Sequence, residues 1–127
     1  MIAMVTGASS GFGEAISRLL VNAGYRVIGT GRRAERLAAL AGELGEQFLP
    51  LAFDVQDKAA TRAAIAGLPA EWSEVDLLVN NAGLSGKSKF VDAPWQELAG
   101  EIQLMITAVT ELAHRVIWCM VHGSPPE

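Results

Sequence analysis

Apolar and polar positions follow two alternating spacings along the chain, and each spacing predicts a different kind of element. Short apolar runs predict buried strands, the first of them at residues 2–6. Segments in which apolar side chains recur at intervals of three and four predict amphipathic helices, the first at residues 14–23. A glycine-rich turn over residues 7–13 joins this strand to this helix. The chain therefore opens with a strand, a turn and a helix.

The same alternation continues as far as residue 80. Further strands are predicted at residues 26–30, 48–55 and 75–80, and further helices at residues 34–44 and 58–67. Strand and helix alternate at short intervals, which favours a parallel sheet with helices on both faces. There are no internal repeats and no linker, so we expect a single domain.

The last predicted element is the longest. From a cap at Asp92, with Pro94 in the first turn, helical spacing continues to about Val121. Its main apolar stripe is formed by Trp95, Leu98, Ile102, Met105, Val109, Leu112, Val116 and Met120. Further apolar residues lie off this stripe, and a helix that is apolar on more than one face requires a deep core or a partner chain. We therefore expect self-association through residues 94–121.

The glycine turn has a physical rationale as a phosphate site. Gly7 can adopt backbone angles closed to other residues, Gly11 lets the main chain approach a pyrophosphate, and Gly13 lets the helix lie close to the strand. The free N–H groups and the positive end of the helix dipole would then hold the phosphates. Taken alone, the turn also fits an ordinary strand-to-helix connection, because its Gly-x-x-x-Gly-x-Gly spacing departs from the general Gly-x-Gly-x-x-Gly fingerprint.

Composition narrows the class of protein. The chain has 127 residues, of which 50% are hydrophobic and 19% charged, and this favours a folded globular protein. The net charge of −4, with no run of Lys or Arg, argues against nucleic acid or an anionic membrane as a partner. A single cysteine, Cys119, fits a reducing compartment. No signal-peptide pattern opens the chain, and no stretch reaches about 18 consecutive apolar residues, so we expect a cytoplasmic protein.

Four motifs stand in order at the ends of the successive predicted strands. They are Thr6–Gly13, Gly31-Arg32-Arg33, Asp54-Val55 and Asn80-Asn81-Ala82-Gly83. This combination resembles the short-chain dehydrogenase/reductase family, and details near the motifs are similar to its bacterial NADP-dependent 3-hydroxy acid (serine) dehydrogenases. The resemblance covers residues 1–84. It implies an α/β Rossmann-type fold with about four parallel strands in the order 3-2-1-4, followed here by the long C-terminal helix.

The resemblance also implies a cofactor site, residue by residue. The phosphates would be lined by Gly7, Ser9, Ser10, Gly11 and Phe12, with Gly13 packing the helix against the strand. Arg32 and Arg33 would reach the adenosine ribose, and Asp54 and Val55 would flank the adenine. Asn81, Ala82 and Gly83 would pass near the adenine-side ribose and steady the sheet.

The end of the second predicted strand indicates which dinucleotide is bound. An NAD site needs a carboxylate about 20 residues past the glycines, to hold the ribose 2′-hydroxyl. Here Gly31 occupies that place, and Arg32 and Arg33 follow it. Guanidinium groups pair well with a phosphate, so the sequence predicts NADP(H) as the cofactor.

The catalytic residues that the resemblance implies do not occur in the chain. The family uses a serine, a tyrosine with a lysine four residues later, and an asparagine on the long helix. The only tyrosine is Tyr25, with Gly29 four residues on, and Met105 stands at the place of the asparagine, where we expect a core side chain. No catalytic and no metal-binding residue is predicted.

Three interpretations of the whole chain remain open. We expect an N-terminal, truncated part of an NADP-dependent oxidoreductase, inactive by itself and acting on a small molecule only when the missing half is supplied. The alternatives are a stand-alone nucleotide-binding module without catalysis and an interaction protein that pairs through its long helix. We expect residues 1–127 to form the N-terminal part of one dinucleotide-binding domain.

Overall fold

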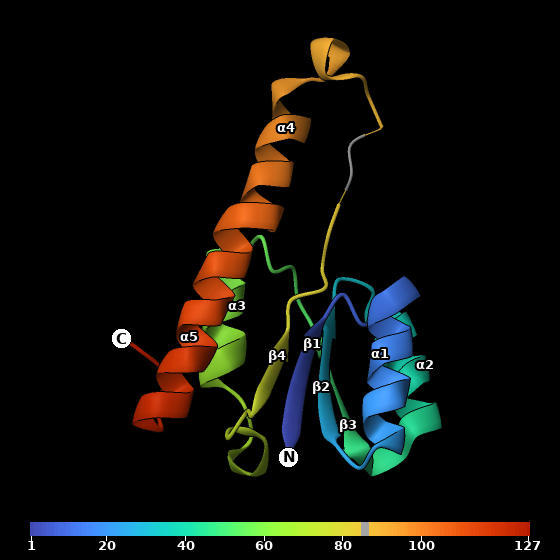
Figure 1. Cartoon of the computed structure of the whole chain (residues 1–127), viewed down its shortest axis with the longest axis vertical. Coiled ribbons are helices and arrows are strands. Elements are labelled where there is room, and N and C mark those ends of the chain that lie inside the picture. The colour runs from blue at the N-terminus through green and yellow to red at the C-terminus, as the bar shows by residue number, and fades with distance from the viewer. Residues whose placement is uncertain (85–86) are drawn as a thin grey trace.

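A four-stranded parallel sheet organises the computed structural model, which describes residues 1–84 and 87–127 (Figure 1). The strands are β1 (Ile2–Thr6), β2 (Arg26–Gly31), β3 (Phe48–Ala52) and β4 (Leu77–Val79). They lie in the order β3-β2-β1-β4, which confirms the predicted sheet. β1 is central, and all five of its residues are buried. This explains its uninterrupted apolar sequence, since a parallel strand covered on both faces needs no polar side.

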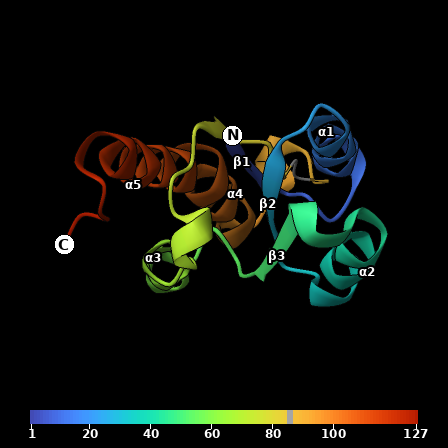
Figure 2. The ribbon, with the colours of Figure 1, turned by 90° about the horizontal axis from the view of Figure 1, so that it is seen from below.

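Helices cover both faces of the sheet, as predicted. They are α1 (Gly11–Asn22), α2 (Ala34–Leu44), α3 (Lys58–Ala66), α4 (Trp95–Ile102) and α5 (Val109–His122). Seen from below, α1 and α2 lie on one side of the strands, and α3 and α5 on the other (Figure 2). Single-turn 3₁₀ helices occur at Gly45–Gln47, Ala70–Trp72 and Phe90–Asp92.

The side chains of β1 divide the core into two layers. Ala3 and Val5 pack with Leu37, Leu40 and Phe48 beneath α1 and α2. The alternate residues of the strand, Ile2 and Met4, pack on the opposite face in a cluster that includes Ile65, Trp72, Val75, Leu112 and Val116. The period of two in a strand therefore places one half of β1 in each layer.

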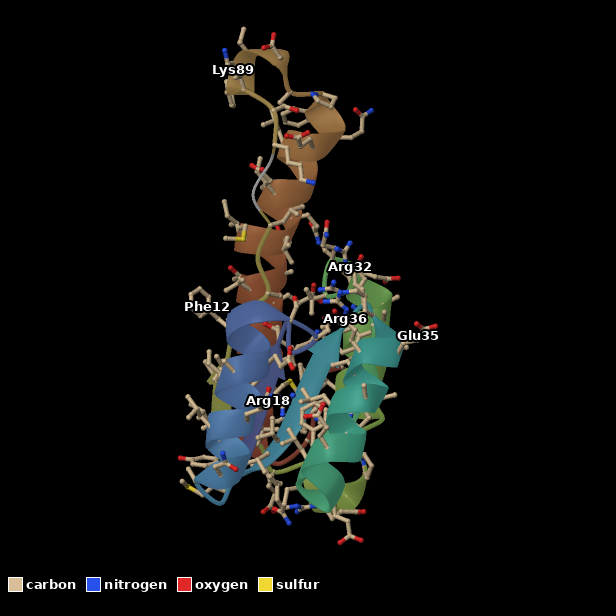
Figure 3. The ribbon with its side chains drawn as sticks, turned by 90° about the vertical axis from the view of Figure 1, so that its right-hand side faces the viewer. Phe12, Arg18, Arg32, Glu35, Arg36 and Lys89 are labelled. Carbon is tan, nitrogen blue, oxygen red and sulfur yellow. The ribbon has the colours of Figure 1, made fainter. Side chains whose placement is uncertain are left out.

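The two outer helices α1 and α2 are also joined by charge. Arg18 on α1 donates to Glu14 one turn earlier at 2.9 Å and to Glu43 on α2 at 2.6 Å (Figure 3). The hydrogen bond and charge of Arg18 hold the pKa of the Glu43 carboxyl below its ordinary value. Both groups are exposed, so we assign this pair a role in orienting the helices and little stability.

The long C-terminal helix differs from the prediction at its start. Asp92 ends the 3₁₀ turn Phe90–Asp92 and caps nothing, while Pro94 holds the cap position in an extended conformation (φ −64°, ψ 145°). The predicted cap at Asp92 is therefore wrong, and the helix begins at Trp95. A π-helical turn, Gln103–Ala108, connects α4 to α5. α4 stands beyond the carboxyl end of the sheet, whereas α5 lies along it (Figure 1).

The π turn changes which residues of this helix face the sheet. Leu104, Ala108, Leu112 and Val116 are buried, so the predicted stripe is correct only at Leu112 and Val116, and its last residue, Met120, is 44% exposed. The stripe residues nearer the start are exposed: Trp95 at 68%, Ile102 at 48% and Met105 at 50%. By length and mean hydropathy alone (1.4 in its most apolar window) the segment Trp95–His122 could also cross a membrane, a property shared by core helices of soluble proteins.

β4 forms one edge of the sheet. It pairs with β1 through Leu77, Leu78 and Val79, and no other described strand pairs with its outer side. The strand is shorter than the predicted 75–80. Asp76 precedes it and binds back to β1, where its carboxylate accepts a hydrogen bond from the Ile2 amide at 2.8 Å.

We predict opposite effects for two glycine-to-alanine changes in helices. A Cβ on Gly13 would overlap the carbonyl oxygen of Gly7 and lie 2.6 Å from Nδ2 of Asn81, whereas a Cβ on Gly42 of α2 meets nothing within 4 Å. Gly13→Ala should lower the free energy of unfolding by about 1–3 kcal/mol or more through overpacking. Gly42→Ala should raise it by about 0.5–1 kcal/mol. Urea unfolding of both variants tests this; a neutral Gly13→Ala would contradict the close contact.

Candidate functional site

A cavity of about 260 Å³ opens at the carboxyl ends of the strands, between the turn after β1 and the loops after β2, β3 and β4. Most of the predicted site residues line it: Gly7, Ser9, Ser10, Arg32, Arg33, Asp54, Val55, Asn81, Ala82 and Gly83. They come from four loops because the carboxyl ends of parallel strands meet at one edge of a sheet. The four sequence motifs therefore converge on one place.

Three predicted residues lie outside the lining. Gly13 is buried beneath the turn, as expected for a packing residue. Gly11 starts α1 with φ +57°, a conformation that favours glycine, and the space around it is open. The side chain of Phe12 is 82% exposed and projects away from the fold (Figure 3). Phe12 can therefore contact a ligand in the cavity only through its main chain.

The turn after β1 is held to β4 by two polar side chains. The hydroxyl of Thr6 accepts from the amides of Asn81 (3.0 Å) and Ala82 (2.9 Å). The side-chain amide of Asn81 donates in return to the carbonyls of Thr6 (3.1 Å) and Gly7 (3.3 Å). Asn81 thus ties the loop after β4 to the turn after β1. Sequence reasoning did not single out Thr6, although it is the last polar residue before the turn.

Gly7 is the residue that lets the turn after β1 and the loop after β4 approach each other. Its φ is +67°, and an added Cβ would lie 3.0 Å from both Cα of Ala82 and Nδ2 of Asn81. Any side chain there would strain the backbone and separate the two loops.

Two arginines border the cavity on the side of β2. Arg33 donates from Nη2 to the hydroxyl of Ser10 at 2.8 Å, whereas Arg32 makes no hydrogen bond to the described residues. Gly31, the last residue of β2, directly precedes them, and a Cβ there would lie 3.1 Å from Oγ of Ser9. The one carboxylate of the lining, Asp54, accepts from the Gln56 amide at 2.9 Å and so shapes its own loop. Two cations against one engaged carboxylate leave this end of the cavity suited to an anion.

One buried polar atom in the wall has no partner. Thr30, the residue before Gly31, is fully buried, and its hydroxyl makes no hydrogen bond within the described part of the chain. Such an orphan is uncommon in a folded interior. Because the residue is fully buried, its hydroxyl is not accessible to a ligand in the cavity.

Other lining residues were not foreseen. They are Thr30, Phe53, Gln56, Leu84 and Leu104. Leu104 belongs to the π turn, and the neighbouring Gln103 donates to the carbonyl of Gln56 at 3.1 Å, which ties the long helix to the loop after β3. Helical periodicity does not reveal a π turn, so no sequence pattern would have placed Leu104 here.

Met105 lies beside Gly83 of the lining and is not the core residue that we expected. It is half exposed, and its sulfur lies 3.5 Å from where a Cβ on Gly83 would stand. A thioether carries no proton to transfer, so the residue contributes apolar surface only. Among the described residues, no group of His, Cys, Asp and Glu could hold a metal ion.

Comparison with known proteins agrees with this geometry. The chain is 44% identical over 115 residues to a serine 3-dehydrogenase of Rhizobium radiobacter, covering 90% of this chain and 46% of the relative. It is 55% identical over 85 residues to an NADP-dependent 3-hydroxy acid dehydrogenase of Salmonella typhi, covering 67% and 34%. A solved structure of serine dehydrogenase in its closed form, complexed with NADP⁺, superposes with a TM-score of 0.91 at 40% identity, covering 97% and 50%.

The chain thus spans half or less of the length of these relatives. The profile of the short chain dehydrogenase family nevertheless matches residues 1–125, nearly the whole of it. Together with the parallel sheet in the order 3-2-1-4 and the four loops that meet at its carboxyl edge, this match shows that the chain belongs to the short-chain dehydrogenase family.

Proposed function

We propose that this chain is the NADP(H)-binding part of a short-chain oxidoreductase, which transfers hydride between the nicotinamide and a carbonyl or hydroxy substrate. The observation that carries the proposal is the cavity in which the glycine turn and the Gly31-Arg32-Arg33 loop face each other. The first offers main-chain donors at a helix start, and the second offers two guanidinium groups. Both the glycine turn and the arginine loop are suited to an anion. NADP(H) carries an anionic group for each of them, the pyrophosphate and the 2′-phosphate.

The phosphate end of the site would be built from the main chain. Amides of Ser9, Ser10 and the first turn of α1 would bind the pyrophosphate, and a Cβ on Gly11 would meet nothing within 4 Å, so the main chain there is open to approach. The absence of a Cβ at Gly13 allows α1 to start directly behind the turn. The positive end of the helix dipole then adds to the attraction for phosphate.

The adenosine end of the site would be built from side chains. Arg32 and Arg33 would take the 2′-phosphate, and Asp54 and Val55 would border the adenine. Asn81, Ala82 and Gly83 would lie along the adenine-side ribose. Because a glycine occupies the place where a carboxylate would bind a ribose hydroxyl, the site repels no phosphate there. The NADP-dependent relatives support this preference.

The substrate that we propose is a 3-hydroxy acid. This rests on the likeness to the serine and 3-hydroxy acid dehydrogenases and on no contact within the cavity. Reduction of a carbonyl by hydride leaves an alkoxide that needs a proton from a positioned acid. Tyr25, the one tyrosine, precedes β2 at the end of the strand away from the cavity. The chain therefore supplies cofactor binding, and we propose that catalysis needs residues beyond these 127.

A second candidate function is an interaction module that pairs through its long helix. The observation that favours it is the exposed apolar surface of that helix, with Ile106 at 60%, Ile117 at 56% and Val121 at 70% exposure. Self-association through this helix is compatible with nucleotide binding, because none of these three residues lines the cavity. We propose a cytoplasmic location for either function.

The cofactor preference can be tested at Arg32. A charge-assisted hydrogen bond contributes roughly 1.5–3 kcal/mol, so Arg32→Ala should weaken NADPH binding by about tenfold to a hundredfold. NADH binding should hardly change. Arg36→Ala removes the same charge from a separate groove between α1 and α2 and serves as the matched control (Figure 3). Titration of each protein with both nucleotides decides; equal losses for NADPH and NADH would contradict the assignment.

The chain alone should catalyse nothing. General acid–base catalysis typically contributes about 10²–10⁴-fold, and the described lining of the cavity holds no tyrosine–lysine pair to supply it. The assay follows NADPH formation from NADP⁺ with 3-hydroxy acids, with and without the C-terminal half of a serine dehydrogenase. Activity only in the presence of the added half is the expected result. Turnover by the 127-residue chain that persists through repurification would contradict the proposal that catalysis needs further residues.

The chain should self-associate at micromolar concentration. Apolar residues exposed on the long helix and the unpaired edge of β4 both favour association. Ile117→Lys should weaken association, while Gln47→Lys, which adds the same charge at an exposed site after α2, should not. Sedimentation velocity over a dilution series measures this. A stable monomer at tens of micromolar would rule out the helix as a self-association surface.

A further inference from the structure

The hydroxyl of Ser10 does not make the capping hydrogen bond that its position in the chain favours. Ser10 is the N-cap of α1, where serine ordinarily accepts a hydrogen bond from an amide of the first helical turn. It makes no such bond here. Its oxygen instead accepts from Nη2 of Arg33, 2.8 Å away and 23 residues further along the chain. The first amides of α1 therefore remain available to a ligand, and the Ser10 hydroxyl is hydrogen-bonded to Arg33 instead.

The bond spans the mouth of the cavity. β1 and β2 are paired up to Thr6 and Thr30, so the turns that follow them leave the sheet side by side. Ser10 stands on the turn that faces the pyrophosphate and Arg33 on the loop that faces the 2′-phosphate, and both line the cavity. Arg33 is exposed and makes no ion pair among the described residues, so the serine is the one described hydrogen-bond partner of its guanidinium.

We propose that Ser10 is a positioning residue for cofactor specificity: it holds the guanidinium of Arg33 where the 2′-phosphate of NADP(H) binds. The inference rests on the proposed function. An arginine side chain loses considerable rotamer freedom when it binds a phosphate, and an existing hydrogen bond removes part of that loss beforehand. Arginine has five N–H donors, so the bond to Ser10 leaves the others for the phosphate. Ser10 therefore acts only on a cofactor that carries the additional phosphate.

The test is a double-mutant cycle on the full chain, with NADPH and NADH as probes. Ser10→Ala should weaken NADPH binding roughly threefold to tenfold, the range expected for one hydrogen bond, and leave NADH within about twofold. Ser10→Thr keeps the hydroxyl and should restore NADPH binding. In an Arg33→Ala background, Ser10→Ala should cause no further loss, because the partner is already gone.

Other outcomes overturn the inference. Equal losses of NADPH and NADH, or a loss that persists without Arg33, would mean that Ser10 binds phosphate directly. Unchanged NADPH binding in Ser10→Ala would mean that the bond has no role in recognition. Thermal unfolding is a second readout: because the hydroxyl makes no capping bond, the midpoint should not fall, and a marked fall would identify it as a cap. If the wild-type chain bound neither nucleotide, the proposed function would fail together with the inference. In each of the other outcomes the wild-type chain binds at least one nucleotide, so the two failures can be told apart.

Discussion

The close approach of α1 to the end of β1 is the constraint on which the site depends. It requires Gly13, since any Cβ there would enter the carbonyl of Gly7. Asn81 then fills the remaining space and donates to the carbonyls of Thr6 and Gly7. The hydroxyl of Thr6 in turn accepts hydrogen bonds from two amides of the loop after β4. Helix, turn and neighbouring loop are thus fixed together before any ligand arrives, and a rigid set of amides costs little to organise on binding.

We propose that charge gives this rigid turn its selectivity. Main-chain amides and a helix dipole do not distinguish one dinucleotide from another. We therefore attribute discrimination to the end of β2 and the loop after it, where Gly31 stands in the place of a carboxylate and Arg32 and Arg33 supply positive charge. The bond from Arg33 to Ser10 joins the two functions physically. The general and the selective parts of the site are therefore a single unit.

Much of this could be predicted from the sequence because the signals were local. The bounds of α2 follow from apolar periodicity and a glycine stop, whereas the order of the strands and the cofactor residues were implied by the family resemblance. Ten of the thirteen predicted cofactor residues line the cavity, namely all but Gly11, Phe12 and Gly13. The errors lie where tertiary packing overrides periodicity. Met105 fits a helical stripe, but the π turn rotates the helix so that Leu104 and Ala108 face the sheet. Asp92 has a capping side chain, but the extended Pro94 starts the helix later.

The most direct measurement is phosphorus NMR of NADP⁺ titrated with pH in the presence and absence of the chain. The central claim is that the 2′-phosphate lies against the guanidinium groups of Arg32 and Arg33. Nearby positive charge favours the dianion, so the pKa of the 2′-phosphate should fall on binding, observable between about pH 5 and 8. The account predicts this fall together with a shift of the pyrophosphate resonances. Shifted pyrophosphate resonances with an unchanged 2′-phosphate titration would contradict it.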